Sequence, residues 1–382
     1  MPEPLRVGLV GCGHISATYL RLAPMFRGYR ITAVADVNAQ AAQARAQEFG
    51  LPARGVEELL NAADIDLVLN LTPPTAHAKL SRASLNAGKH VYSEKPFVLS
   101  IDEGRDLTTL AKQNGLRIGA APDTFLGGAQ QLARALVDQE RCGPIASGTA
   151  VMMSRGMEHW HPNPDFFYQP GAGPVLDIGP YYLCALVNLL GPVRQVAAFA
   201  LSAWPTRTIG NGPRQGEMIP VSTPTTFHAL LTFESGTLLT LLLSWDVCSH
   251  GHNPIELYGS QATLYVPDPN FFGGQARIGQ ADGRVETPSW DHPLLRPNNA
   301  QDQANYRGAG LADMALAIAE GRAHRCAQDL ALHGVEVMTA LLESADSGRV
   351  IPMTTSCTRP DALAPEAARA LFTHSTRTGA HP

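Results

Sequence analysis

Lysine is the scarcest charged residue in this chain. Only four of the 29 basic residues are lysines, at positions 79, 89, 95 and 112, and the others are arginines. Chemistry that needs a lysine amine must therefore come from the first third of the sequence. Charged residues make up 16% of the chain and the formal net charge is -5. This balance provides no basic surface for a nucleic acid backbone or an anionic membrane, so we expect neither partner.

Long apolar runs and closely paired cysteines are also missing. The longest apolar stretches, such as 237–244, are much shorter than the roughly 18 residues that span a bilayer, and we interpret them as buried strands. The first residues enter a strand pattern without the basic and apolar segments of a secretion signal. The six cysteines are scattered with no C-x-x-C pair, which is typical of reduced thiols. We therefore predict a cytoplasmic protein with no disulfide framework.

Metal ligands at a suitable spacing are equally scarce. His250 and His252 lie two residues apart, but no further ligand accompanies them in the sequence. Two histidines at this spacing are more often loop residues than a metal site. We predict no metal.

The chain does contain enough apolar residues for more than one core. Its 382 residues exceed the roughly 250 to 300 at which a single hydrophobic core stops growing, and 45% of them are apolar. The pattern of strands and helices changes near residue 122. We predict two domains, 1–122 and 123–382.

The first domain alternates short apolar strands with amphipathic or alanine-rich helices. This alternation is typical of βαβ units and predicts an α/β Rossmann domain, a doubly wound parallel sheet with helices on both faces. The predicted strands are 5–10, 30–35, 66–71, 90–92 and 117–120, and the predicted helices are 14–23, 38–49, 56–62, 75–87 and 100–114.

The second domain has longer strands that follow one another directly. Residues 234–236 read Glu-Ser-Gly between two apolar runs, a hairpin signal that indicates antiparallel pairing. We predict an α+β domain with a large, open, mainly antiparallel sheet, and a partly loose tail over 354–382. Its predicted strands are 145–154, 193–203, 226–233, 236–244, 254–259 and 262–266, and its predicted helices are 124–140, 177–190, 302–320 and 328–346.

A glycine-rich turn follows the first predicted strand and opens a helix. Gly11 permits the tight turn, and Gly13 lets a pyrophosphate approach the amides of His14 and Ile15 at the helix N-terminus. Asp36 ends the second strand, where a carboxylate binds the ribose diol of NAD and repels the 2′-phosphate of NADP. NAD is therefore favoured, and NADP stays open. The alternative for Asp36 is an ordinary N-cap of the next helix.

Three further segments carry a resemblance to a known family. They are Asn-Leu-Thr-Pro-Pro-Thr-Ala-His at 70–77, Ala-Gly-Lys-His-Val-Tyr-Ser-Glu-Lys-Pro at 87–96, and Gly-Ala-Gly-Pro-Val-Leu-Asp-Ile-Gly-Pro-Tyr at 171–181. Together with the glycine turn they resemble the glucose-fructose oxidoreductase/inositol dehydrogenase (Gfo/Idh/MocA) family, in the same order along the chain. The resemblance implies cofactor contacts from Gly11, Gly13, His14, Ile15, Asp36, Thr72, Pro73, His77, Glu94 and Lys95.

The same resemblance implies catalytic roles for Lys95, Asp177 and Tyr181. Lys95 matches the family's catalytic lysine, with Pro96 commonly following a cis peptide, and Asp177 matches the substrate-binding acid. Tyr181 stands where many members have histidine and some have tyrosine, which leaves open whether Lys95 or Tyr181 is the general base. Family members often have a further acid three residues after the Tyr181 position, and in this chain Cys184 stands there instead. The plain alternatives are a surface lysine, a helix N-cap at Asp177 and a core aromatic at Tyr181.

Weaker signals suggest additional substrate contacts. Asp123 follows the last parallel strand, where open α/β sheets bind ligands, although it could instead cap the next helix. His161 and Asn163 lie in an aromatic segment, 160–168, that could bind sugar hydroxyls and stack on a sugar ring, although core packing is an equal contender. The expected substrate contacts are thus Lys95, Asp123, His161, Asn163, Asp177 and Tyr181.

These observations predict an NAD-dependent dehydrogenase or reductase acting on a hydroxyl or carbonyl of a sugar, sugar derivative or polyol. Two alternatives stay open: a glycosidase that oxidises C3 transiently with bound NAD, and a non-catalytic sugar-binding regulator of the same fold. Retention of Lys95 argues against the last. The resemblance also implies a homodimer or homotetramer formed through the open face of the second-domain sheet.

Overall fold

The chain forms two compact units, and both are discontinuous in sequence. The computed structural model describes residues 3–373. The first unit combines 1–131, 291–332 and 360–382, and the second combines 132–290 and 333–359. The chain therefore returns to the first unit twice after leaving it. The domain boundary expected after residue 122 stays a prediction.

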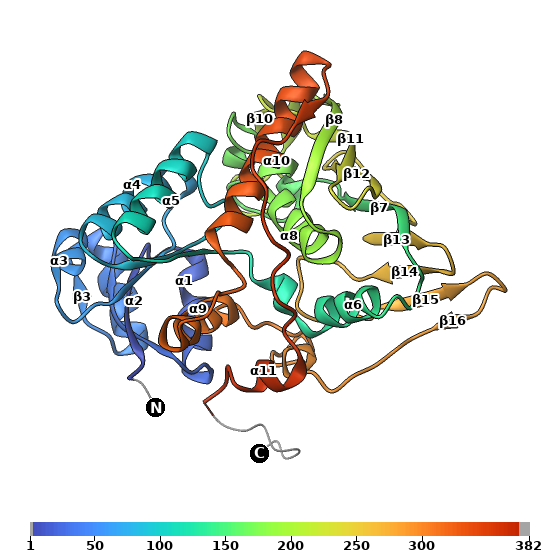
Figure 1. Cartoon of the computed structure of the whole chain (residues 1–382). Helices are drawn as coiled ribbons and strands as arrows, with labels where there is room; N and C mark the ends of the chain where they lie inside the picture. The colour runs from blue at the N-terminus through green and yellow to red at the C-terminus, as the bar shows by residue number, and fades with distance from the viewer. Residues whose placement is uncertain (1–2, 374–382) are drawn as a thin grey trace. The chain divides into compact units, whose positions relative to one another are not determined.

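A parallel sheet of six strands forms the centre of the first unit (Figure 1). The order β3-β2-β1-β4-β5-β6, with every pair parallel, confirms the predicted Rossmann-type α/β fold. The strands are β1 (Leu5–Val10), β2 (Tyr29–Ala35), β3 (Ala53–Arg54), β4 (Leu67–Asn70), β5 (His90–Ser93) and β6 (Ile118–Ala120). Because all run the same way, the loops that follow them gather at one edge of the sheet, which we call the carboxyl edge.

The helices between these strands are those expected, within one or two residues. They are α1 (His14–Leu22), α2 (Ala39–Phe49), α3 (Val56–Asn61), α4 (Pro74–Asn86) and α5 (Ile101–Gln113). Local residues explain where they begin. Asn38 caps α2 by accepting hydrogen bonds from two amides, and Ser100 caps α5 by accepting one from the amide of Glu103. Pro74 occupies the first turn of α4, where no amide hydrogen is needed.

A mixed, mainly antiparallel sheet of nine strands dominates the second unit, as predicted. Its order is β16-β15-β14-β13-β7-β12-β11-β8-β17, and the β7–β12 pair is parallel. The strands are β7 (Ile145–Met153), β8 (Val193–Leu201), β11 (Thr226–Phe233), β12 (Leu238–Ser244), β13 (Ile255–Gly259), β14 (Ala262–Val266), β15 (Arg277–Gln280), β16 (Val285–Glu286) and β17 (Ile351–Pro352). A short pair, β9 (Thr206–Thr208) and β10 (Met218–Pro220), lies apart from it.

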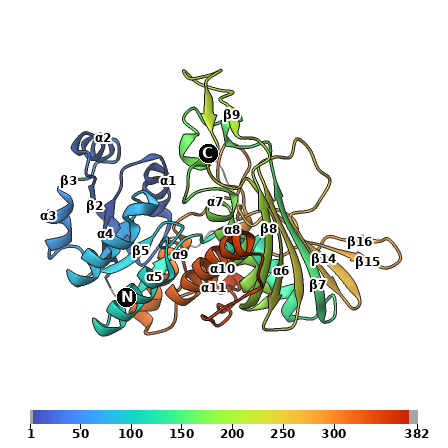
Figure 2. The ribbon, with the colours of Figure 1, turned by 90° about the horizontal axis from the view of Figure 1, so that it is seen from above.

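Helices α8 (Gly179–Leu190) and α10 (Gln328–Ser347) lie together on one face of this sheet (Figure 2). The Tyr182 hydroxyl donates to the carbonyl of Val151 on β7, and the amide of Ala198 on β8 donates to the Ser344 hydroxyl on α10. Side chains that point to the helices, such as Val196 and Leu231, are buried. Along these strands, buried side chains that face the helices alternate with more exposed ones on the opposite face. The core of the unit therefore lies between the sheet and the two helices.

Two predicted helices begin in the wrong place. The helix expected over 177–190 is interrupted, because α7 (Pro174–Asp177) ends before α8 begins at Gly179. Pro180 explains the break, since proline has no amide hydrogen to donate to the carbonyl of Leu176 and so cannot continue the hydrogen bonding of α7 into α8. The helix expected from 302 begins later, as α9 (Ala309–Glu320), after Gly308 in the left-handed region with φ of +103°.

Six short strands, β3, β9, β10, β15, β16 and β17, were not expected from the sequence. The remaining differences are small. The helix expected over 124–140 is a short 3-10 turn, Thr124–Leu126, followed by α6 (Gly128–Asp138). The tail contains one short helix, α11 (Pro365–Arg369), and Phe372 stacks on Phe26 with ring centroids 5.6 Å apart. The remainder of the tail, 374–382, lies outside the described residues. Over the part of the chain that the structure describes, we find no helix long and apolar enough to cross a membrane.

Large apolar side chains line the sheet face opposite α8 and α10. Phe199 is 75% exposed and Leu230 is 49% exposed, and both belong to adjacent strands, β8 and β11. Leu201 and Leu238 extend the same apolar surface. Apolar surface gathered in this way on one sheet face is typical of a protein interface.

We therefore predict a homodimer or homotetramer that uses this open face. Replacing Phe199 and Leu230 together with arginine should reduce the molar mass measured by light scattering at micromolar concentration, because unpaired charges would be buried in the interface. Thr109→Arg, on an exposed position of α5, is the control and should leave the mass unchanged. A monomeric mass for the wild-type protein would contradict the prediction.

Candidate functional site

The glycine turn after β1 is shaped by close contact with the loop after β4. Gly11 has a φ of +104°, and a Cβ atom on it would lie 2.5 Å from the carbonyl carbon and oxygen of Leu71. Only glycine fits this position. Its amide donates to the carbonyl of Ala35 at the end of β2, at 2.9 Å. The glycine turn is therefore held between the loop after β4 and the end of β2.

The N-terminus of α1 has room for an anion. Gly13 is the N-cap residue and has no side chain to occupy the first amides of the helix, those of His14 and Ile15. A Cβ atom on Gly13 would meet nothing within 4 Å, so the space beside these amides is open. Gly13 and His14 are also exposed. These features fit the pyrophosphate of a dinucleotide.

The carboxylate of Asp36 lies beside the glycine turn. One oxygen accepts from the Cys12 amide at 2.7 Å, and the other accepts from the Asn38 amide at 2.8 Å. The alternative of Asp36 as the N-cap of α2 is wrong, because Asn38 has that role. A carboxylate oxygen accepts more than one hydrogen bond, so Asp36 retains capacity for a ribose diol. Burial, with Asp36 nearby, raises the pKa of the Cys12 thiol to about 11, which keeps it neutral.

The segment after β4 is organised by Asn70, which our sequence analysis did not single out. Its buried side chain accepts from the Thr72 hydroxyl at 2.6 Å and donates to the carbonyl of His77 at 3.2 Å. His77 is fully buried, with Nδ1 2.7 Å from the carbonyl oxygen of Pro96 and Nε2 2.8 Å from that of Thr72. The histidine therefore links the loops after β4 and β5, while Pro73 remains exposed.

Glu94 fixes the backbone of the catalytic-lysine candidate. One carboxylate oxygen accepts from the Lys95 amide at 2.8 Å, and the other accepts from the Tyr19 hydroxyl on α1 at 3.0 Å. Burial and the Glu94 carboxylate hold the pKa of Tyr19 well above its usual value, so the hydroxyl stays protonated and donates. Lys95 is half-buried, and the peptide bond between Lys95 and Pro96 is cis, as the resemblance implies.

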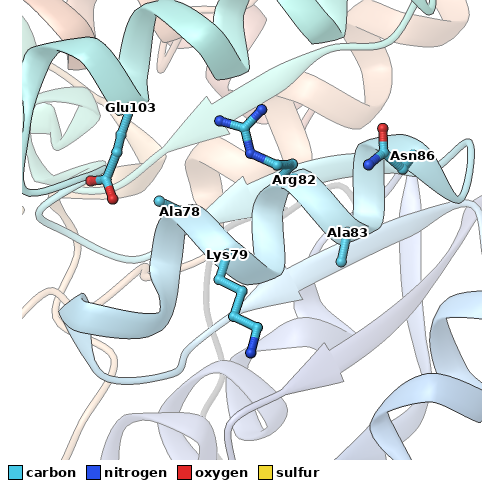
Figure 3. Close-up of a pocket in the computed structure, with 6 residues that line it drawn as sticks. All are labelled: Ala78, Lys79, Arg82, Ala83, Asn86 and Glu103. Atoms are coloured by element: carbon cyan, nitrogen blue, oxygen red, sulfur yellow. The ribbon is translucent and has the colours of Figure 1, made fainter.

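Three of the four lysines lie elsewhere in the fold, and all four are among the described residues. Lys89 precedes β5 and donates to the carbonyls of Ala62 and Ile65. Lys112 lies in the last turn of α5. Lys79 lines a groove of about 400 Å³ on the outer side of α4, together with Ala78, Arg82, Ala83, Asn86 and, from α5, Glu103 (Figure 3). Lys95 is thus the one lysine at the carboxyl edge.

Asp123 follows β6 and is 2% exposed. One carboxylate oxygen accepts from the amides of Gly308, at 2.9 Å, and Gly310, at 3.0 Å, at the start of α9. Its side chain does not cap the 3-10 turn that follows it, so that alternative is wrong. The geometry gives Asp123 a role in holding α9 against the sheet.

In the second unit, Asp177 and Tyr181 lie on either side of the break between α7 and α8. Asp177 is half-buried and is the last residue of α7, so it is not the N-cap that we considered. Tyr181 is 8% exposed and lies in the first turn of α8. The two residues are not on one continuous helix, in contrast to our expectation. Burial raises the pKa of Cys184 to about 12, so this residue provides no charge in place of an acid.

The segment 157–168 carries the other two predicted substrate residues and combines exposed and buried aromatic rings. The His161 ring lies edge-on to Trp160, Phe166 and Phe167, with centroids 5.4 Å apart in each case. Trp160 and Phe166 are more than half exposed, whereas Phe167 packs on the buried Trp245. Asn163 is exposed, and its amide donates to His161 Nδ1 at 3.1 Å. The segment thus has a packed base and an accessible aromatic surface.

A buried ionic network supports this segment, and our sequence analysis did not detect it. Arg207 Nη1 lies 3.1 Å from Glu158 Oε1, and Arg207 also pairs with Asp246. The Tyr168 hydroxyl donates to Glu158 and accepts from the amide of Met157 at 3.0 Å. These partners are far apart in sequence, so no motif identifies them. The network holds both ends of the aromatic segment.

Histidines 250 and 252, considered above as metal ligands, stack with ring centroids 6.1 Å apart. Within residues 3–373 no three histidine, cysteine, aspartate or glutamate side chains are grouped so that they could hold a metal ion. The absence of a metal from this protein stays a prediction.

Two family models match the chain. Residues 5–121 match the oxidoreductase family with an NAD-binding Rossmann fold, GFO_IDH_MocA, and residues 130–265 match the GFO/IDH/MocA C-terminal domain. The chain therefore belongs to the GFO/IDH/MocA oxidoreductase family. Its first domain is an NAD-binding Rossmann domain, as the geometry of the glycine turn and Asp36 suggests.

Curated relatives in this family include sugar and polyol enzymes. A dTDP-3,4-didehydro-2,6-dideoxy-alpha-D-glucose 3-reductase from Saccharopolyspora spinosa is 28% identical over 273 residues, which are 70% of this chain and 75% of that protein. An inositol 2-dehydrogenase from Salmonella typhimurium is 32% identical over 118 residues, which are 30% of this chain and 35% of that protein. The chain is accordingly an oxidoreductase of a family that acts on sugars and polyols.

Solved structures share the fold at low sequence identity. Levoglucosan dehydrogenase in its apo form has a TM-score of 0.78 at 22% identity, covering 93% of this chain and all of the other. An NAD-binding oxidoreductase from Klebsiella pneumoniae has a TM-score of 0.77 at 21% identity, covering 92% of this chain and all of the other. These likenesses support the two-domain fold.

The buried position of Asp123 leads to a prediction about stability and pH. Burial raises the pKa of Asp123 to about 6, although the hydrogen bonds from the two glycine amides act in the opposite direction and lower it. Because the folded chain then binds this proton more tightly than the unfolded chain, its contribution to the free energy of unfolding should decrease as the pH rises from about 4 to about 6, and stay constant above. Urea unfolding of the wild type and Asp123→Asn across this range measures the effect. A stability difference independent of pH would contradict it.

The position of Asp36 leads to a prediction about the cofactor. Asp36→Ser should weaken NADH binding by about tenfold or more, because a charged acceptor for the ribose diol is lost, and should relax the rejection of NADPH. Calorimetric titration of both dinucleotides measures this. Asp36→Asn is the matched variant, since it keeps an acceptor for the Cys12 amide but removes the charge. Wild-type preference for NADPH would show that Asp36 does not select the cofactor.

Proposed function

We propose that this protein is an NAD-dependent dehydrogenase or reductase that transfers hydride between the nicotinamide and a secondary hydroxyl or carbonyl of a sugar, sugar derivative or polyol. Membership of the GFO/IDH/MocA family supports the class of reaction. The observation that carries the proposal is the position of Lys95. It is the one lysine at the carboxyl edge of the NAD-binding sheet, and Glu94 fixes its backbone.

The reaction needs a group that accepts a proton from the substrate hydroxyl. Bound NAD⁺ supplies the hydride acceptor. When the alcohol carbon loses hydride, the proton on its oxygen must leave as well, and a cation near that oxygen stabilises developing negative charge. We assign both tasks to Lys95: its neutral amine takes the proton, and the ammonium that forms stabilises the negative charge developing on the oxygen. In the reverse direction this ammonium returns the proton. The positive charge of NAD⁺ bound beside Lys95 would favour the neutral amine, because two like charges repel each other.

We assign substrate recognition to residues of the second unit. Asp177 can accept hydrogen bonds from a pair of sugar hydroxyls, and Tyr181 can donate one that orients the reacting group. The exposed rings of Trp160 and Phe166 suit stacking on sugar C–H groups, with His161 and Asn163 as polar contacts beside them. We assign Asp123 to the support of α9 and not to substrate binding, because its carboxylate is buried and engaged by two amides.

A substrate screen tests this proposal. The purified protein is incubated with NAD⁺ or NADP⁺ and a panel that includes myo-inositol, levoglucosan and common aldoses, and the absorbance of the reduced nicotinamide is followed. The reverse reaction is tested with keto sugars and NADH. Net reduction of NAD⁺ by one of these alcohols supports the proposal. Cleavage of a glycoside without net NADH would establish the glycosidase instead, and sugar binding with no turnover in either direction would indicate a regulator.

The division of labour between Lys95 and Tyr181 can be tested with single variants. Lys95→Met should reduce turnover by at least about 10² to 10⁴-fold, because both acid–base catalysis and alkoxide stabilisation are lost, with NADH affinity largely kept. Tyr181→Phe should cost less and mainly raise the KM for substrate. Steady-state kinetics and NADH titration measure both. An inactive Tyr181→Phe together with an active Lys95→Met would show that tyrosine carries the proton.

A further inference from the structure

The carbonyl oxygen of Gly13 is unusually well supplied with donors. The Ser16 hydroxyl donates to it at 2.6 Å and the Ser16 amide at 3.3 Å. Arg45, which lies on α2, donates to the same oxygen through Nη2 at 3.2 Å. A carbonyl oxygen has two lone pairs, so this acceptor is fully used. The orientation of the peptide between Gly13 and His14 is therefore held by two side chains.

This orientation determines where the His14 amide points. In a trans peptide the carbonyl and the following N–H point in opposite directions. With the Gly13 oxygen held by Ser16 and Arg45, the His14 N–H points away from them. As the first amide of α1 it has no acceptor within its own helix.

Arg45 is itself held firmly beside the turn. Its Nη1 pairs with Glu48 one turn further along α2, and its side chain is 17% exposed. Its Nε is buried with no acceptor among the described residues, which costs free energy that the Gly13 and Glu48 contacts must offset. The positive charge of Arg45 also acts on the turn, since it opposes the rise in the pKa of the neighbouring Cys12.

From these contacts we propose that Ser16 and Arg45 are positioning residues for the dinucleotide, which together preset the His14 amide toward the pyrophosphate. Ser16 stands where dinucleotide-binding turns commonly have a third glycine, and its hydroxyl supplies a contact that glycine cannot make. Arg45 adds a positive charge that attracts the pyrophosphate. The inference rests on the NAD-binding role of this domain and not on the identity of the sugar substrate.

The test compares ligands with and without the pyrophosphate. Calorimetry gives the dissociation constants of NADH, ADP and adenosine for the wild type, Ser16→Ala and Arg45→Gln. Each variant should bind NADH and ADP about tenfold more weakly, the equivalent of one hydrogen bond to a charged group, while adenosine binds as before. The double variant should lose less than the product of the two single losses, because both side chains act on one carbonyl.

Two control variants separate this role from general damage. Arg54→Gln and Arg82→Gln each remove an arginine of the same unit that pairs with an aspartate and does not contact Gly13. Both should bind NADH and ADP within about twofold of the wild type. Equal losses for ADP and adenosine in Ser16→Ala or Arg45→Gln, or no loss for ADP, would overturn the proposal. Thermal unfolding of each variant identifies any loss that comes from misfolding, and Ser16→Gly then tests loss of the hydroxyl with the residue that dinucleotide-binding turns commonly have at this position.

Discussion

Main-chain hydrogen bonds join the loops at the carboxyl edge of the parallel sheet to their neighbours. The cofactor site of the first unit depends on these hydrogen bonds, because its residues lie on those loops. The bonds run from Gly11 to Ala35, from Leu71 to Val10, from Glu94 to Asn70 and from Ala121 to Ser93, each between 2.8 and 2.9 Å. They extend the ladder of the sheet beyond the strands themselves. Residues on these loops are therefore placed by a rigid scaffold, and binding a cofactor there requires little further ordering.

Buried or half-buried carboxylates reinforce the same edge. Asp36, Glu94 and Asp123 follow three different strands. Asp36 and Asp123 accept main-chain amides from the glycine turn and the start of α9, and Glu94 accepts the amide of Lys95, the next residue. A carboxylate that accepts amide hydrogen bonds binds more strongly than a neutral acceptor would. These acids thus position backbone as well as presenting charge. Positive charge at this edge comes from Lys95, from Arg45 and from the N-terminus of α1.

The second unit uses a different device for its aromatic segment. Glu158, Arg207 and Asp246 are almost fully buried, and removing charges from water carries a high cost unless every group is paired. Here the two acids share the guanidinium of Arg207, and Tyr168 and Thr225 add hydrogen bonds to them. The network makes the base of the segment rigid, so Trp160 and Phe166 can remain exposed without the segment losing its conformation. A preformed aromatic surface of this kind suits a ligand with both apolar and polar faces.

Much of the fold could be predicted because its signals are local. Apolar periodicity identified the five longer strands of the Rossmann sheet and the helices between them, and the hairpin at 234–236 indicated antiparallel pairing in the second unit. The glycine turn and Asp36 identified the cofactor site, since their spacing along a βαβ unit is itself a local pattern. Errors arose where a single residue overrode the pattern, as Pro180 does between α7 and α8 and Gly308 does before α9.

The sequence by itself determined the two kinds of sheet, the NAD-binding turn and the family, because each depends on residues close together in the chain. Only the tertiary structure decided that Asn70 and His77 join the loops after β4 and β5, that Asp123 holds α9, and that Arg45 reaches the carbonyl of Gly13. These contacts link residues on different elements, up to 187 positions apart. Their geometry follows from how the elements pack, and a polar residue in the sequence does not reveal which distant amide or carbonyl it will meet.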